Sequence, residues 1–415
     1  FSRSAWGPRV AGLESKLLTR ARCKMPYGMN RAGTLALAAA CCLCALSLHA
    51  ADPLQAASMK AAVVPGADLL VAVDAAAWRQ APIQEKINAI RAEMSEAGLP
   101  PQMREMQDRV EQFRDRLGIK EEDVDSFVFS IQVQQAAEAV RNLSRVDDML
   151  AQFAMVAAVK LNRPLTADAV RDAVTAAAAE EGVEPHFEAG EYKGAVTLTA
   201  SFAAKPGAQA GLQANLPSEL FMALLDKGRL AYIGSPVHVK SAVDRGQANT
   251  PSGYSAELAA ARQTIMPDAA SYALFAVGDK LRGMAADAAA QQQQNPMFGG
   301  ALKALSGLRT VAFGGIGDTT IKAVLAAEFT TPQEAIQIKT LVETTVLGMA
   351  KMAIMQAVGR PIPLMNAMSA AAVDKRFEVS VEMTEEDCRE LAKLQTRALR
   401  QGGPPMGAPM FPPAP

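Results

Sequence analysis

Residues 67–74 read ADLLVAVD, a short run of Leu, Val and Ala that is typical of a buried β-strand. Residues 270–277 (ASYALFAV) repeat this pattern in the second part of the chain. Residues 195–202 (AVTLTASF) and 376–383 (RFEVSVEM) alternate apolar and polar side chains, as a strand does when one face packs on a core. The two pairs of similar strands predict that the chain consists of two related halves.

Helical patterns separate these strands. Apolar residues spaced three and four apart between 75 and 118 predict an amphipathic helical hairpin, interrupted by GLPP at 98–101. Helices are also predicted over 166–180 and 279–291. The capping box Thr331-Pro332-Gln333-Glu334 begins another helix, which is expected to run to about residue 358.

The remaining apolar runs complete the pattern of each half. Further strands are predicted at 125–133, 153–161, 220–225, 229–233, 308–315 and 320–329. The resulting order is β-α-β-β-α-β in both halves, which favours an α+β fold with two ferredoxin-like halves, built from largely antiparallel sheets backed by long amphipathic helices.

The expected domain organisation follows from this pattern and from changes in composition. Residues 1–51 form a signal peptide with an upstream segment, and 52–250 form the first half, with the helical hairpin and an extra β-hairpin. Residues 251–401 form the second half, with 244–253 (DRGQANTPSG) as the linker. The Gly, Pro and Met tail at 402–415 is expected to be disordered because it cannot build a core.

The N-terminal segment has the layout of an export signal. Starting from Met29, a basic residue (Arg31) precedes an apolar run at 34–48 and the small residues at 50–51. Two alternatives are a retained membrane anchor, for which the run is short, and a lipoprotein modified at Cys41, where Ala38 fits the expected motif poorly. We therefore expect an exported protein of the periplasm or cell envelope, with the extracellular space as an alternative, and with no transmembrane helix in the mature chain.

The charge distribution argues against nucleic acid as a partner. Residues 1–33 contain seven Lys or Arg and one Glu, whereas residues 52–415 contain 35 basic and 42 acidic residues, a net charge of −7. An acidic mature chain without a basic block offers little to a phosphate backbone.

Few residues of the mature chain are suited to catalysis. Four of the five cysteines precede residue 52, and the fifth, Cys388, follows three acidic residues that disfavour its thiolate. The two histidines, His186 and His238, have no Gly-x-Ser-x-Gly motif near them, and no metal-binding motif is present. We expect a protein that is not an enzyme, with no catalytic residues, no cofactor and no metal site.

Apolar helical surface is the remaining candidate for function. The candidate binding residues are Trp78, Met106 and Phe113 on the helical hairpin and Met349, Met352 and Met355 in the Met-rich segment. For each of these residues the alternative role is packing in the core. For the methionines a further alternative is binding of a cuprous ion by their thioether sulfurs.

We therefore expect a non-catalytic exported binding or structural protein, with a protein partner or an apolar ligand. One alternative is a hydrolase whose carboxylates are assembled in space. Another is a carrier with an enclosed apolar cavity.

Two segments carry a resemblance to known sequences. The stretch 65–74 (PGADLLVAVD) and the stretch 225–246 (LDKGRLAYIGSPVHVKSAVDRG) resemble a broad group of exported bacterial proteins of unknown function. The resemblance implies export and duplicated α+β halves, and it implies no activity and no site residues.

Overall fold

The computed structural model describes residues 56–96, 111–132, 154–180, 183–204, 219–250, 255–291, 296–348 and 367–400, together with 54, 108, 351, 352 and 355. Within these residues, no helix is both long and apolar enough to cross a membrane. The predicted signal segment at 1–51, the tail at 402–415, Met106 and Met349 lie outside the described residues.

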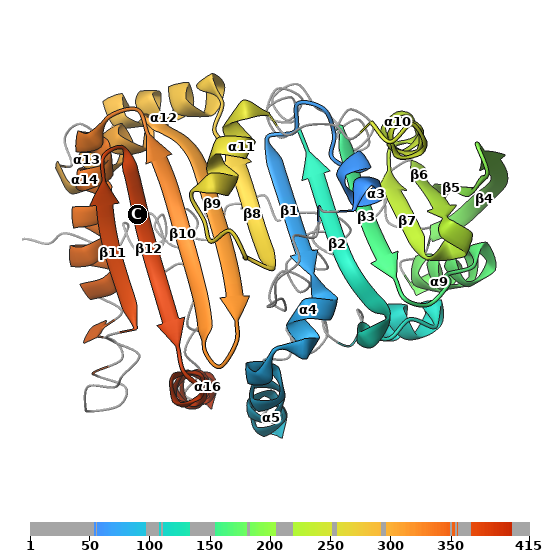
Figure 1. Ribbon diagram of the computed structural model, residues 1–415, viewed down its shortest axis with the longest axis horizontal. Helices are drawn as coiled ribbons and strands as arrows, with labels where there is room; N and C mark the ends of the chain where they lie inside the picture. The colour runs from blue at the N-terminus through green and yellow to red at the C-terminus, as the bar shows by residue number, and fades with distance from the viewer. Residues whose placement is uncertain are drawn as a thin grey trace, which may run out of the picture.

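One twelve-stranded sheet runs through the whole molecule (Figure 1). Its strands are β1 (Leu69–Asp74), β2 (Val124–Ile131), β3 (Met155–Leu161), β4 (Val183–Tyr192), β5 (Ala195–Ala204), β6 (Glu219–Leu225), β7 (Leu230–Gly234), β8 (Ser271–Ala276), β9 (Leu308–Gly317), β10 (Ile321–Phe329), β11 (Met368–Val373) and β12 (Arg376–Met383). The spatial order is β11-β12-β10-β9-β8-β1-β2-β3-β7-β6-β5-β4, and every neighbouring pair is antiparallel. The predicted α+β class with largely antiparallel sheet is confirmed.

The helices lie between and around these strands. They are α3 (Ala57–Ala61), α4 (Ala75–Gln80), α5 (Pro82–Glu96), α9 (Ala167–Glu180), α10 (Pro236–Gln247), α11 (Ala256–Gln263), α12 (Asp279–Gln291), α13 (Pro296–Leu305), α14 (Pro332–Leu341) and α16 (Glu385–Arg400). The capping box predicted at Thr331 is formed: its hydroxyl accepts from the Glu334 N–H, and the Glu334 carboxylate accepts from the Thr331 N–H. Past α14, the chain continues in a π-helix, Val342–Leu347.

The ferredoxin-like halves are not confirmed by the strand order. A ferredoxin-like unit places its third strand between the first and second, whereas here β2 lies between β1 and β3, and β9 lies between β8 and β10. The chain leaves β8 through the helices α12 and α13 and returns as the adjacent antiparallel strand β9. A hairpin of two helices makes this possible because it brings the chain back to the edge where it left the sheet.

The two halves are nevertheless built alike and are joined directly. The order β1-β2-β3-β7 in the first half corresponds to β8-β9-β10-β12 in the second, and β1 pairs with β8. The helices α5 and α16 also meet at one rim of the sheet, where Lys86 Nζ lies 2.8 Å from Glu385 Oε2 (Figure 1). The predicted boundary at 250/251 falls between α10 and α11, and Asp244 and Arg245 of the predicted linker belong to α10.

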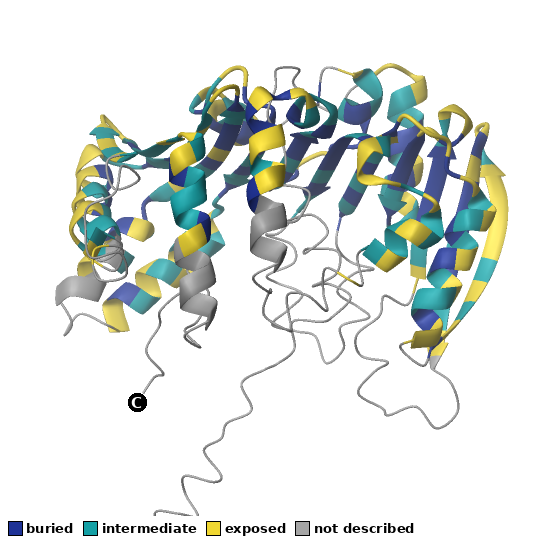
Figure 2. Ribbon diagram, turned by 90° about the horizontal axis from the view of Figure 1, so that it is seen from below, coloured by how far each residue is buried: buried dark blue, intermediate teal, exposed yellow. Residues whose placement is uncertain are grey.

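The sheet is arched, and the two faces are covered by different helices (Figure 2). The convex face carries α3, α10 and α11, which bury a long core containing Leu70, Tyr232, Tyr272 and Leu274. Helices α9, α12, α13 and α14 lie on the concave side, over two smaller clusters of buried residues at the two ends of the sheet.

A segment that precedes β1, residues 56–67, is held on the convex face and is named here the N-terminal strap. Its backbone is bound by side chains of the sheet and of α10: Tyr232 Oη donates to Ser58 O (2.6 Å), Arg245 donates to Ala61 O (2.7 and 3.1 Å), and Ser130 Oγ donates to Ala62 O (3.0 Å) and accepts from Val64 N (3.0 Å). Burial raises the pKa of Tyr232 to about 12, so its hydroxyl remains a donor at neutral pH.

Candidate functional site

The concave face of the sheet is apolar across its whole width. Strand register aligns one residue of each strand in a single row on this face. The row consists of Ala370, Val379, Leu325, Phe313, Ala273, Val71, Phe129, Ala157, Ile233, Met222, Leu198 and Ala189. Every second residue of a strand points to the same face, so the alternation in each strand and the register between strands together produce this continuous surface.

Helices cover the two ends of this surface more fully than its middle. Near β5 and β6, the residues Leu198 and Leu224 are buried in a cluster with α9. Near β12, Phe377 is buried in a cluster with α14. Between these ends, Phe313 is 41% exposed and Leu325 is 39% exposed.

We name the uncovered middle the apolar strip. It consists of Val71, Phe129, Ala273, Phe275, Phe313 and Leu325, all at least partly exposed. Helix α12 follows β8, the strand that contains Ala273 and Phe275, and packs mainly against α13. Helix α13 in turn packs against α14, so α12 and α13 do not close over the strip. Exposed aromatic and aliphatic side chains that adjoin one another mark a site of interaction more often than isolated ones do.

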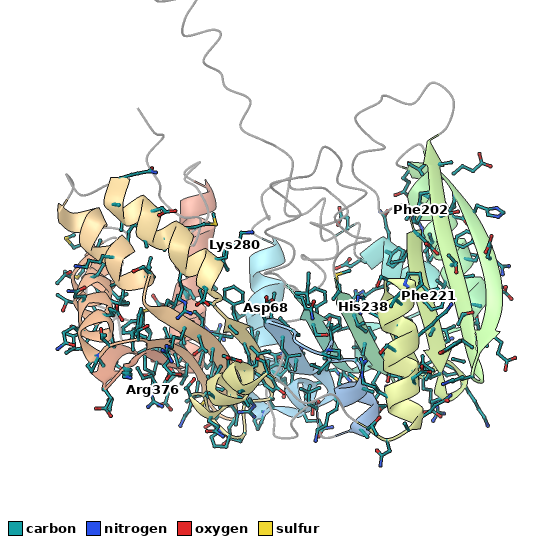
Figure 3. The ribbon with its side chains drawn as sticks, turned by 90° about the horizontal axis from the view of Figure 1, so that it is seen from above. Asp68, Phe202, Phe221, His238, Lys280 and Arg376 are labelled. Atoms are coloured by element: carbon teal, nitrogen blue, oxygen red, sulfur yellow. The ribbon has the colours of Figure 1, made fainter. Side chains whose placement is uncertain are left out.

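Charged groups lie at both ends of the strands under the strip. Arg309, at the start of β9, is exposed and lies at a shift of register between β9 and β10. Lys280, in the first turn of α12, is half-buried on the concave side of the sheet (Figure 3). At the opposite ends lie Asp318, in the turn between β9 and β10, and Asp74, the last residue of β1. The buried Asp68 lies at the same end as Lys280, where its backbone carbonyl accepts from the Ala276 N–H, and Arg79 and Lys160 lie near Asp74, so each end carries charges of both signs.

The residues predicted to form a binding surface are distributed over several elements. Trp78 is only 5% exposed and packs with Ala81 and Ile83, so it belongs to the core and not to an open surface. Phe113 is half-buried. Met352 and Met355 are exposed.

The surroundings of Asp74 change its acidity. Burial raises its pKa, an effect opposed by the N–H of Ala77, which donates to Oδ1 at 2.8 Å, and reinforced by the nearby charge of Asp125. Two neighbouring carboxylates are the arrangement expected of a hydrolase, yet here Oδ1 caps the first turn of α4. The position of Asp74 is explained by this structural role.

The histidines and the cysteine lie in separate places. His186 is exposed on the edge strand β4, and His238 is half-buried on α10 (Figure 3). Burial lowers the pKa of His238, and the charge of Arg245 adds to this effect. Burial and then the charge of Asp387 raise the pKa of the Cys388 thiol. Among the described residues, no group of three or more His, Cys, Asp or Glu is placed to hold a metal ion.

A polar cluster that the sequence analysis did not identify joins β4 to α10. Tyr192 Oη donates to Asp244 Oδ1 (3.0 Å), and Lys193 Nζ lies 2.8 Å from the same oxygen. The ammonium of Lys240 lies 5.6 Å from the centre of the Tyr192 ring and 5.4 Å from that of Phe221. The hydrogen bond from Lys193 lowers the pKa of Asp244. This exposed cluster fastens the edge of the sheet to α10.

The strip could be predicted only in part, because the strands that contain Phe313 and Leu325 were found from their apolar pattern while their alignment was not.

Comparison of the chain with protein-family models, with curated proteins and with solved structures finds no match.

Proposed function

We propose that this chain is an exported, non-catalytic binding protein that holds an apolar ligand on the apolar strip. The observation that carries the proposal is the exposure of Phe313 and Leu325, which face each other in register on adjacent strands of the apolar concave face. The proposed binding surface therefore lies on the sheet, whereas the sequence indicated the helices.

The energetics of the strip support a binding role. Covering the surface that Phe313 and Leu325 still expose would contribute on the order of 3 kcal/mol. The partly exposed neighbours Val71, Phe129 and Phe275 would add to this value. A surface of this kind costs solubility when it is left open, which is a reason to expect a ligand for it.

Export remains part of the proposal and rests on the N-terminal sequence. The predicted signal ends at residue 51, and Leu54, which is fully buried in the core of the convex face, follows almost at once. Removal of the signal at this point would leave the strap intact. Export is tested by expressing the whole chain in a bacterial host and determining the N-terminus of the periplasmic product; a product that stays cytoplasmic with residues 29–51 attached contradicts it.

The binding role is tested with Nile red, a neutral dye whose fluorescence rises in apolar surroundings. We expect the chain to bind the dye and the double variant F313S/L325S to lose most of that signal. The control is V237S, since Val237 is 74% exposed but stands alone on α10. Equal dye binding by F313S/L325S and V237S, with thermal unfolding showing both variants folded, would refute the proposal.

A further inference from the structure

The apolar strip has no side chain that could pair with a charge or with a backbone N–H. Its six members are Val, Phe, Ala and Leu residues, and their register neighbours Val311, Ala327 and Val379 are apolar as well. A charged side chain or a backbone N–H that was pressed against this surface would lose its hydration and gain no partner. The strip therefore favours an uncharged occupant with few hydrogen-bond donors.

The C-terminal tail, residues 402–415 (GGPPMGAPMFPPAP), has this composition. It contains no charged side chain, and six of its residues are prolines, which have no backbone N–H. Its large side chains are those of Met406, Met410 and Phe411. Proline-rich segments favour the polyproline II conformation, which needs no internal hydrogen bonds, and surfaces lined by aromatic rings are a common type of binding site for them.

The place where the tail begins brings it to the concave side. Helix α16, which ends at Arg400, starts beyond β12 and runs from the rim of the sheet toward the concave side (Figure 2). Strand β12 is the direct neighbour of β10, which contains Leu325, and β9 with Phe313 comes next. The two residues of the strip that are most exposed therefore lie on the strands closest to the start of α16.

The tail is also long enough to return to the sheet. Helix α16 has 16 residues and spans about 24 Å. Residues 402–415 span about 43 Å in the polyproline II conformation. After reaching back along α16, the tail would have enough length left to cross several strands, which lie about 4.8 Å apart.

Resting on the proposed function, we infer that the C-terminal tail of the same chain lies on the apolar strip and competes there with the ligand. Met406, Met410 and Phe411 supply the apolar contacts, and the prolines bring the backbone to the strip with few N–H groups to desolvate. A ligand has to displace the tail, so the tail sets the ligand concentration at which the strip is filled.

The first test measures the Kd of Nile red for the full chain and for a chain that ends at Gln401. A short tether provides an effective concentration of about 1 mM, and with an intrinsic Kd of about 0.2 mM for the tail, its removal should tighten dye binding about fivefold. M406S/M410S/F411S, which keeps the length and the prolines, should have the same effect. The matched control is A408S/A414S, which changes two small side chains of the same tail and should bind the dye like the native chain.

The second test locates the tail directly. Benzoylphenylalanine in place of Phe411 should, on irradiation, cross-link to the tryptic peptides 310–322 and 323–339, which contain Phe313 and Leu325. Mixing isotopically labelled and unlabelled chains shows whether each cross-link lies within one molecule. Cross-links found only between two molecules would refute the inference, because the tail would then occupy a second copy.

The outcomes separate this inference from the proposed function. If the chain that ends at Gln401 binds Nile red no more tightly than the full chain, and F313S/L325S still abolishes dye binding, the tail inference fails and the proposed function stands. If F313S/L325S binds the dye like the native chain, the proposed function fails. Intramolecular cross-links from position 411 to the strip would in that case still support the docked tail.

Discussion

The N-terminal strap should depend on one small side chain, Ser130. This residue is fully buried, and its hydroxyl accepts from the Val64 N–H and donates to the Ala62 carbonyl, both at 3.0 Å. Replacement by Ala removes both partners and leaves two buried backbone groups without a hydrogen bond. Each unsatisfied group costs about 1–2 kcal/mol, so S130A should lower the free energy of unfolding by about 2–4 kcal/mol.

Urea unfolding followed by circular dichroism measures this change. The control is S369A, since the Ser369 hydroxyl lies 2.6 Å from Ser380 Oγ at an exposed position, where its loss should cost less than about 0.5 kcal/mol. Limited proteolysis provides a second measurement, because a loosened strap should be cleaved earlier in S130A than in the native chain. A loss below about 0.5 kcal/mol in S130A would show that the strap contributes little to the stability of the sheet.

Three further predictions address other parts of the fold. G228A should destabilise the chain by more than about 2 kcal/mol in thermal unfolding, because φ is +87° at Gly228 and a Cβ there would lie 2.2 Å from Leu165 O. The control G118A should cost only about 1 kcal/mol, because Gly118 has a φ of +64° but open space around it. Burial raises the pKa of Asp74 above its ordinary 3.8, so protonation of this carboxylate favours the folded state. D74N should therefore unfold at a higher urea concentration than the native chain at pH 7. This gain in stability should vanish below pH 3.8, where the native carboxylate is protonated in both states. The raised pKa of Cys388 predicts slower reaction with Ellman's reagent at pH 8 in the folded chain than in urea, and equal rates would contradict it.

Local patterns were sufficient to find most of the central strands. The runs at 67–74 and 270–277 correspond to β1 and β8, and the alternation at 376–383 corresponds to β12. These strands are read easily because each buries at least one face, and burial imposes a period of two on the side chains.

The two edge strands were not predicted as strands, for a physical reason. Strand β4 (VEPHFEAGEY) carries a proline and three glutamates, and β11 (MSAAAV) is short and rich in alanine. An edge strand has one partner instead of two, and charged or small residues there discourage pairing with other chains. The charged and small residues that protect an edge strand also interrupt the apolar alternation from which a strand is predicted.

The predicted binding residues and the observed strip differ for a related reason. The size of Trp78 and its position at the start of a helix predict a binding residue, but the fold places it in the core with Ile83. Phe313 and Leu325 belong to ordinary strand patterns, and nothing within either strand distinguishes an exposed aromatic ring from a covered one. Their exposure depends on where α12 and α13 pack, which is a property of distant residues.

The amino-acid sequence by itself determined the α+β class, most of the strands, the capped helix at Thr331 and the acidic character of the chain after residue 51, because each depends on neighbours within a few positions. Only the tertiary structure decided that both halves form one sheet, that the pair of helices α12 and α13 returns the chain to the adjacent strand β9, and that twelve apolar residues align in one row. Those properties depend on strand register and on helix packing between residues far apart in the chain, and many arrangements of the same elements satisfy the local pattern equally well.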